Sequence, residues 1–434
     1  MSTQLSRLLK LLGATLLSVL VGLVPTAVSA PAIGAITGTT VPKTVVLDGA
    51  QLVTIKAQLA TGTASSSQKA ALNSLLAQAN TALTAGPWSV TDKNVVPPSG
   101  DKHDYLSHAP YQWASKPKTP GNPLGCPYVN RDGQRNPEAD AISDHAERAQ
   151  AFDAIPNLAL AWFYTHDAKY AQRAALDIRT WFLDPATKMN PNLTYSQVIP
   201  CVDRVSGTGI IDTSQSISSV FDAFAILDSG APGWTSEDHS AATTWVGQFL
   251  NWMQTSPQAK LELAATNNHG SYIDMQNATA ALYIGNKTMA KSIVESVKKN
   301  RIAKQIKADG SQPLELTRTI SWHYANFNLT ALGRLAEIGK QVGVDLWGYT
   351  APNGGSIDKA VDFLIPAAEK GVSAWSYPQI SPLDQSISTD ILHAAAEQGH
   401  DKLAAAAIPL VPKPPIGDLW PIRPSTLCLD NPLK

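Results

Sequence analysis

Apolar residues recur three and four positions apart along most of the chain from residue 141 onward, as in amphipathic helices. The segments 141–167 and 168–183 form a predicted helix pair joined by a tight His-Asp turn, and Asp184-Pro185 ends the second helix. Further helices are predicted at 47–60, 66–85, 212–228, 236–255, 270–284, 287–303, 321–341, 356–369 and 387–406. The pattern predicts a largely helical chain.

The order of these helices limits the choice of fold. No alternating strand pattern extends beyond a few residues, and short turns separate most of the helices. We therefore expect an all-α array of paired helices, either closed into a barrel or left as an open arc. The sequence has no repeat with a fixed period, which argues against a tetratricopeptide-type solenoid.

The stretch 87–140 interrupts the helical pattern and is rich in Pro, Gly and Asn. So long a stretch without periodicity in a compact domain indicates either functional loops or disorder. It carries Tyr105, Tyr111, Trp113 and Tyr128, which favour an ordered loop.

Residues 1–30 have the features of a signal peptide. Arg7 and Lys10 precede an apolar run, and the small residues of AVSAPA follow it, which predicts cleavage after Ala30 or Ala32. A membrane anchor is the alternative, but the apolar run is short and ends in small residues. We therefore expect an exported protein in which residues 31–434 form a single domain, with no membrane contact after cleavage.

The processed chain is close to neutral. Arg7 and Lys10 lie in the leader, so 32 of the 34 basic residues remain against 35 acidic ones, a net charge of −3. No strongly basic surface follows, so nucleic acid is not an expected partner, and an anionic ligand would need a local positive cluster. Of the three cysteines, we expect Cys126 and Cys201 to form a disulfide and Cys428 to stay free.

Two polar clusters interrupt the apolar helical pattern. The first is TNNHGSY, in which Asn267, Asn268 and His269 stand at the start of a predicted helix. A helix cap needs one such side chain and does not explain three. The second is ELTRTISWHYANFN at 315–328, which offers Arg318 and Tyr324. Its alternative interpretation is an amphipathic helix with aromatic core residues, in which Arg318 is a surface charge.

Together the two clusters supply an imidazole, a phenol, a guanidinium and a carboxamide. This set suits the removal of a proton alpha to a carboxylate, where negative charge builds up on a group that is already negative. A guanidinium and an amide can hydrogen-bond that carboxylate, while a neutral His or an ionised Tyr takes the proton and a Tyr hydroxyl protonates the leaving oxygen. A glycosidase would need two carboxyl groups at a set separation, and a serine hydrolase would need a GxSxG elbow, which is absent.

The segments TNNHGSY, ELTR and YANFNL resemble the alginate lyase superfamily of polysaccharide lyases, within a subgroup of alginate and glucuronan lyases. The resemblance extends over roughly 90–345 and includes YLSHAPYQW, YVNRDGQRNPE and the block from AWFYTHD to NLTYSQ. It implies an (α/α) barrel or toroid of about six to seven helix pairs, with long loops over the cleft.

The resemblance also implies roles for single residues. Asn268 and Arg318 match the positions that neutralise the uronate carboxylate. His269 matches the catalytic imidazole, and Tyr324 matches the tyrosine that protonates the glycosidic oxygen and in some members also acts as base. Two departures affect Arg318: its spacing to Tyr324 is one residue shorter than in the periplasmic enzymes, and their NNHSYW is NNHGSY here.

Further residues are expected to bind substrate, although plainer roles stay open for them. Arg204 could instead form only a salt bridge, and His323 could simply be exposed. Trp113 could pack within its loop together with His108 and Tyr111. The full set of expected substrate-binding residues is Tyr195, Gln197, Asn267, His323, Arg204 and Trp113. No metal site is expected, because the acidic residues of NRDGQRNPEAD lack the EF-hand spacing.

The resulting hypothesis is a secreted, monomeric polysaccharide lyase without a cofactor, whose partner is an anionic polysaccharide. It cleaves 1,4-linked polyuronates, alginate or glucuronan, by β-elimination. One alternative is an (α/α)-barrel glycoside hydrolase, which would require an acidic pair drawn from Asp140, Asp144 and Glu315. The other is a non-catalytic glycan-binding protein on the same scaffold.

Overall fold

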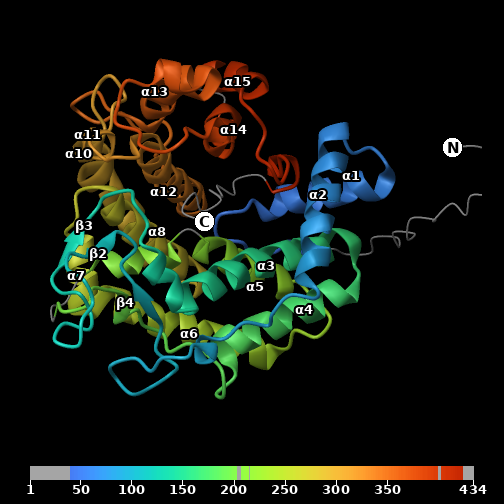
Figure 1. Cartoon of the computed structure of the whole chain (residues 1–434). Coiled ribbons are helices and arrows are strands. Elements are labelled where there is room, and N and C mark those ends of the chain that lie inside the picture. The colour runs from blue at the N-terminus through green and yellow to red at the C-terminus, as the bar shows by residue number, and fades with distance from the viewer. Residues whose placement is uncertain (1–39, 203–206, 215, 399–401, 424–434) are drawn as a thin grey trace, which may run out of the picture. The chain divides into compact units, whose positions relative to one another are not determined.

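Helices dominate the computed structural model, which describes residues 40–202, 207–214, 216–398 and 402–423 (Figure 1). These residues belong to one unit that spans Ile36–Lys434. The α-helices are α1 Gly49–Thr61, α2 Ser66–Ala82, α3 Asp144–Thr165, α4 Ala168–Ile178, α5 Ile217–Leu227, α6 Ser236–Thr255, α7 Pro257–Leu263, α8 Asn268–Tyr283, α9 Lys287–Val297, α10 Ala303–Gln305, α11 Pro313–Leu316, α12 Ser321–Val342, α13 Ile357–Lys370, α14 Thr389–Glu397 and α15 Lys402–Ala407. The prediction of an all-α fold is confirmed.

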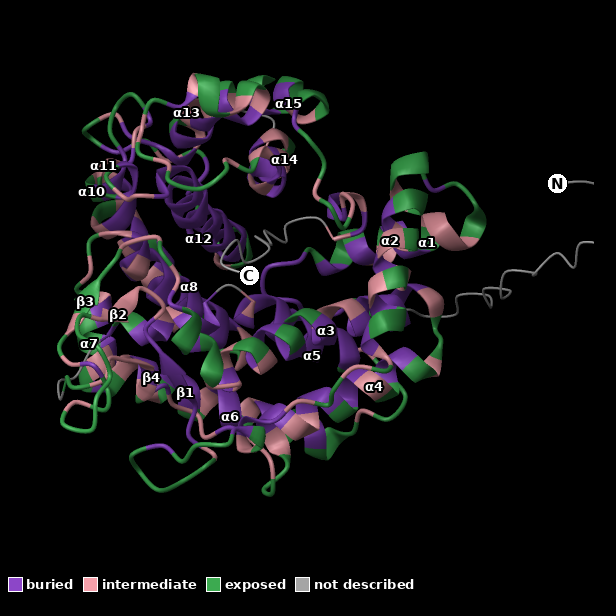
Figure 2. Ribbon diagram, viewed as in Figure 1, coloured by how far each residue is buried: buried purple, intermediate pink, exposed green. Residues whose placement is uncertain are grey.

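Two helices at the centre of the packing carry both polar clusters. In α12 every residue from Ser321 to Gly339 is buried, and α8 is buried from Gly270 to Leu282. Helices that are enclosed on all sides belong to the core rather than to the surface. Figure 2 shows α8 and α12 as mostly buried. α8 packs against α12, α9, α6 and α5, while α3 packs against α2, α4 and α5. The residues at the starts of α8 and α12 therefore stand on rigid supports.

The stretch that interrupts the helical pattern is ordered, as expected. It contributes the strands β1 Leu106–His108, β2 Gln112–Ala114 and β3 Tyr128–Asn130, and a fourth strand, β4 Tyr195–Val198, follows α4. β2 and β3 pair antiparallel, while β1 and β4 pair parallel. The predicted disulfide between Cys126 and Cys201 is present and ties the β2–β3 connection to the segment after β4.

One helix starts later than its periodicity predicts. The expected helix at 212–228 is α5, which begins at Ile217, and a short 3₁₀ turn over Thr208–Thr213 precedes it. Gly209 fits this turn against β4, because a Cβ at this position would lie 2.3 Å from the carbonyl oxygen of Ser196. The close contact explains why glycine occupies this position.

Within the described ranges, no helix combines the length and the apolar character that a membrane crossing requires. The predicted signal peptide, Arg204 and Cys428 lie outside the described residues.

Candidate active site

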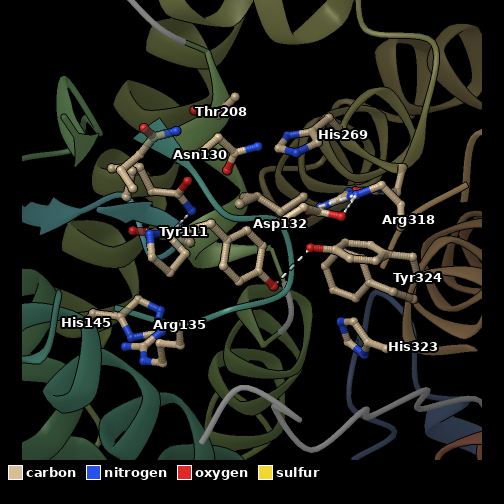
Figure 3. A pocket seen from close by; sticks show the side chains of 18 of the residues that line it. Tyr111, Asn130, Asp132, Arg135, His145, Thr208, His269, Arg318, His323 and Tyr324 are labelled. Carbon is tan, nitrogen blue, oxygen red and sulfur yellow. Dashed lines mark hydrogen bonds and ion pairs between the residues drawn. The ribbon is translucent and has the colours of Figure 1, made fainter. Parts of the chain in front are cut away.

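A cavity of about 470 Å³ lies where the two polar clusters meet the irregular loops. Figure 3 shows His269, Arg318 and Tyr324 on one side of it and Arg135 and His145 on the other. The lining residues come from five places, namely the loop around β2 and β3, the start of α3, the segment from β4 to the 3₁₀ turn, the start of α8, and the start of α12 with the residues before it. The structure thus brings together Asn268, His269, Arg318, His323, Tyr324 and Gln197.

The start of α8 presents two adjacent side chains to the cavity. Asn267 occupies the N-cap position in extended conformation, but its side chain makes no capping hydrogen bond. Its carbonyl oxygen instead accepts hydrogen bonds from the backbone of Gly270 and from Gln305 Nε2. Asn267 is not among the cavity-lining residues, whereas Asn268 and His269 are. Asn268 and His269 therefore face the cavity, whereas Asn267, which was expected to bind substrate, neither lines it nor caps the helix through its side chain.

Gly270 explains one departure from the related sequences. A Cβ at this position would lie 2.2 Å from Arg301 Nη1 and 2.3 Å from the carbonyl oxygen of Ala265. Arg301 donates hydrogen bonds to the carbonyl oxygens of Leu263 and Ala265 and to Asp274. The glycine thus makes room for an arginine that fixes the loop leading into α8.

His269 is oriented by a buried carboxylate. Its Nδ1 lies 2.6 Å from Glu262 Oε1, and because a carboxylate only accepts, Nδ1 carries the hydrogen. This leaves Nε2 as the nitrogen available to the cavity. Burial lowers the pKa of His269, but the negative charge and hydrogen bond of Glu262 outweigh it, so the pKa is raised above its ordinary value. The imidazolium form of His269 is thereby stabilised.

Asn268 is held by a second buried carboxylate. Glu315 accepts hydrogen bonds from the Asn268 backbone at 2.7 Å and from its Nδ2 at 2.6 Å. The Asn268 Oδ1 is buried without a partner. Burial raises the pKa of Glu315 to about 7, although the bonds from Asn268 oppose the rise. Asn268 therefore has an unsatisfied polar atom beside the cavity, a state that is costly unless a ligand or water meets it.

Arg318 is clamped by Asp132, a residue of the irregular loop. Asp132 accepts hydrogen bonds from Arg318 Nε and Nη2, and it also accepts one from the backbone of Thr319. The guanidinium lies 3.6 Å from the centroid of the Tyr324 ring, a cation–π contact. Despite its unusual spacing in the sequence, Arg318 therefore lies next to Tyr324 in the cavity.

The hydroxyl of Tyr324 meets that of a second tyrosine. It donates to Tyr111 Oη at 3.1 Å, as Figure 3 shows. Burial raises the pKa of Tyr324 well above its ordinary value, while the charge of Arg318 acts in the opposite direction. Burial also raises the pKa of Tyr111. Both phenols are consequently protonated at neutral pH.

Gln197 and His323 also face the cavity. Gln197 donates through Nε2 to Asp212 and has a positive φ of 48°, which is uncommon for a residue other than glycine. His323 is buried and stacks on Phe327 with ring centroids 5.3 Å apart. Burial, together with the charge of Arg318, lowers the pKa of His323 to about 3, so its ring is neutral.

Besides Asn267, two more of the expected substrate-binding residues are not placed at the cavity. Tyr195 pairs with Leu106 between β4 and β1 and is not among the lining residues. Trp113 likewise does not line the cavity; its indole donates to the carbonyl oxygen of Gln134, and Arg131 lies 4.9 Å from its ring centroid. Trp113 therefore packs within the irregular loop, which was the alternative expectation for it.

Several lining residues were not expected as site residues. They are Asn130, Asp132, Arg135, His145, Arg148, Thr208 and Asp212. Three of them belong to YVNRDGQRNPE, a segment of the resemblance whose carboxylates suggested only a calcium loop. Within the described chain, no group of three or more His, Cys, Asp or Glu residues has the arrangement of a metal site.

The carboxylates do not form the pair that a glycoside hydrolase needs. Asp144 is fully buried and forms an ion pair with Lys93 at 2.9 Å, and Asp140 pairs with Arg135. Neither is among the described residues that line the cavity. Glu315 is engaged by Asn268 as described above. The hydrolase alternative therefore lacks its acidic pair among the three carboxylates it required.

Comparison with known proteins agrees with this arrangement. The family model described as alginate lyase matches residues 89–375. The chain belongs to the alginate lyase family. The protein is therefore a polysaccharide lyase. No match was found among curated proteins.

Solved structures of alginate lyases share this fold. An alginate lyase from Bacteroides ovatus is 36% identical, covers 88% of this chain and 99% of its own, and superposes with a TM-score of 0.81. Alginate lyase A1-III from Sphingomonas species A1 is 15% identical, covers 93% of this chain and 100% of its own, and has a TM-score of 0.54. A variant of alginate lyase A1-III complexed with tetrasaccharide is 14% identical, covers 89% of this chain and 96% of its own, and has a TM-score of 0.55. The expected (α/α) toroid class is thereby confirmed.

Proposed function

We propose that this polysaccharide lyase cleaves a 1,4-linked polyuronate by β-elimination, with His269 as base and Tyr324 as acid. The observation that carries the proposal is that both residues line one cavity together with Arg318 and Asn268. They come from two helices that pack against each other, so their relative position is fixed by the core. The names of the solved relatives, which are alginate lyases, support an alginate-type substrate.

The assignment of base and acid follows from the partners of the two side chains. Glu262 holds the proton of His269 on Nδ1, so a neutral His269 presents the lone pair of Nε2, and the same carboxylate stabilises the imidazolium that forms. Tyr324 is protonated, which suits a donor rather than an acceptor. The C5–H bond breaks and H5 moves to His269 Nε2. The electrons of the C5–H bond form the C4=C5 double bond. The C4–O4 bond breaks, and O4 takes the proton of Tyr324.

The charge that develops on the uronate carboxylate needs stabilisation. Asp132 engages Nε and Nη2 of Arg318, and Nη1 is not part of that pair, so it can donate to a ligand. Asn268 lies beside His269 with a polar atom unsatisfied. A guanidinium and an amide in a partly buried site stabilise an enolate-like carboxylate more strongly than water does.

Stereochemistry links this assignment to the substrate. In guluronate the proton at C5 and the oxygen at C4 lie on opposite ring faces, which suits a base and an acid on separate side chains. In mannuronate and glucuronate they lie on one face, and Tyr324 would have to serve in both steps. The protonated state of Tyr324 and the Glu262–His269 pair favour the first arrangement.

Secretion is part of the proposal. The leader-like residues 1–30 predict export, and the disulfide between Cys126 and Cys201 is typical of oxidising compartments. Fractionation of cells that express the full chain tests this point: the proposal expects processed protein outside the cytoplasm.

The experiment for the activity is a substrate panel. The purified protein is incubated with polyguluronate, polymannuronate and glucuronan, and the ultraviolet absorbance of the conjugated double bond is followed. The proposal expects an increase on at least one polymer, largest on polyguluronate, and a rate roughly 10²–10⁴-fold lower with Tyr324→Phe. Equal rates for the wild type and Tyr324→Phe would refute the role of Tyr324.

A further inference from the structure

The cavity has a second basic region opposite His269 and Arg318. Arg148 and His145 come from the first two turns of α3 and, being three positions apart, lie on one face of that helix. Arg135 joins them from the loop after β3. Figure 3 shows Arg135 and His145 across the cavity from Arg318 and His269, with Tyr111 between the two groups.

Arg148 is a buried cation with an unsatisfied donor. It is only 2% exposed, it lines the cavity, and its Nε has no hydrogen-bond partner. Buried arginines in folded proteins are normally paired, because an unmatched charged donor is costly to remove from water. A free donor of this kind beside a cavity is available to a ligand.

The nearby carboxylates are already committed to other groups. Asp212 accepts hydrogen bonds from Tyr105, Ser107 and Gln197. Asp140 pairs with Arg135 but does not line the cavity. The ring of His145 is neutral, because burial and the nearby Arg148 lower its pKa to about 4. The charged side chains that line this part of the cavity are therefore two arginines, Arg148 and Arg135, and one carboxylate, Asp212, which neutral donors hold.

We propose that Arg148, with Arg135 and His145, binds the carboxylate of a second uronate, adjacent to the one that loses its proton. This inference rests on the proposed function, because it assumes a polyuronate in the cavity. Tyr111 connects the two ends: its hydroxyl accepts from Tyr324, and the charge of Arg135 acts on it. A chain that passes over Tyr111 presents one carboxylate to Arg318 and the next to Arg148. The enzyme thus binds the carboxylates of two neighbouring sugars.

Binding measurements with matched ligands test this subsite. Tyr324→Phe serves as the background, because it slows turnover strongly during the titration. Calorimetry then compares tetrasaccharides of guluronate, mannuronate and glucuronate with the same tetrasaccharides after reduction of their carboxyl groups. Arg148→Met, added to this background, keeps most of the side-chain volume and removes the charge.

Arg148→Met is expected to weaken binding of the acidic tetrasaccharides about 10-fold or more and to leave binding of the reduced ones unchanged. Arg135→Gln, at a more exposed position, should weaken binding of the acidic tetrasaccharides in the same way. It keeps the proposal testable if the Arg148 variant fails to fold. Lys116→Gln removes a charge from an exposed position in the β2–β3 connection and should change neither affinity. Equal loss for acidic and reduced ligands in both variants, or no loss for the acidic ones, would overturn the proposal.

The outcome is separable from that of the proposed function. If the wild type forms no unsaturated product on any polyuronate, the proposal of β-elimination is wrong. The difference in affinity between acidic and reduced tetrasaccharides still tests the subsite. If the wild type is active and Arg148→Met binds the acidic ligands normally, only the subsite is lost.

Discussion

The guanidinium of Arg318 lies 3.6 Å from the ring centroid of Tyr324, and Asp132 fixes it there from a loop 186 positions away in the sequence. The contact places a positive charge on the face of the ring whose hydroxyl is proposed to protonate O4. A tyrosinate that forms in this step is stabilised by that charge. The clamp also keeps Arg318 from leaving the cavity, so the acid and its electrostatic partner form one unit.

Replacing Tyr324 with Phe removes the proposed acid and little else. Its hydroxyl contacts only Tyr111 among the described hydrogen bonds, so the melting temperature should change little. We expect kcat to fall roughly 10²–10⁴-fold, the usual contribution of a general acid. Tyr283→Phe is the matched control, because Tyr283 is a tyrosine in α8 outside the catalytic cavity, and its kcat should match that of the wild type.

The pH dependence of kcat/KM tests whether His269 is the base. A base must be neutral, so kcat/KM should rise with pH as His269 loses its proton, at a pH above the ordinary histidine pKa because Glu262 raises it. In Glu262→Gln the negative charge is gone and burial lowers the pKa, so the rising limb should move to lower pH and the plateau should drop.

Glu315 is the control for that profile, because its pKa of about 7 lies in the same range. The rising limb should persist in Glu315→Gln, displaced slightly to lower pH because Glu315 also stabilises the imidazolium. A kcat/KM that falls as pH increases through this range would contradict the assignment. It would mean that the imidazolium binds the carboxylate instead of taking the proton.

The clamp on Arg318 is tested by Asp132→Asn. The amide keeps the size of the side chain but loses the bidentate ion pair, so Arg318 becomes less ordered. We expect kcat/KM to fall about 10–100-fold, with kcat affected more than KM, because the position of Arg318 matters most when charge develops. Asp309→Asn, an exposed aspartate that caps a turn, should leave both constants unchanged. A change in KM alone would show that the clamp affects substrate binding only.

The disulfide links the cavity loop to the segment after β4, and its loss should reduce stability. The bond between Cys126 and Cys201 closes a loop of 75 positions, for which the free energy of unfolding typically drops by about 2–4 kcal/mol on removal. Denaturant unfolding of Cys126→Ser, compared with the reduced and the oxidised wild type, measures this. An unchanged midpoint in the variant would show that the loop is held without the bond.

The sequence predicted the long helices, and the four residues it singled out as catalytic line one cavity, for identifiable reasons. Periodicity reports a helix directly, and the clusters around His269 and Tyr324 stand out because polar residues interrupt apolar helices. Asp132 and Arg148 are different. Their importance depends on contacts across the fold, and neither has a local signal that separates it from a surface charge. Trp113 shows the converse, because an aromatic in a loop fits sugar stacking and loop packing equally well until its neighbours are known.

The start of α5 shows a similar limit. Apolar spacing carries through residues 212–228, yet Thr208–Thr213 forms a 3₁₀ turn before α5, and Gly209 in that turn packs against Ser196. Helical periodicity alone does not report where this turn ends and α5 begins.

The most direct test of β-elimination is the fate of oxygen at the new chain ends. Polyguluronate is digested in water enriched in heavy oxygen, and the oligosaccharides are examined by mass spectrometry. The proposal predicts unsaturated ends, each lighter by one water than a hydrolysis product and free of heavy oxygen from cleavage. Saturated ends that carry heavy oxygen would contradict it.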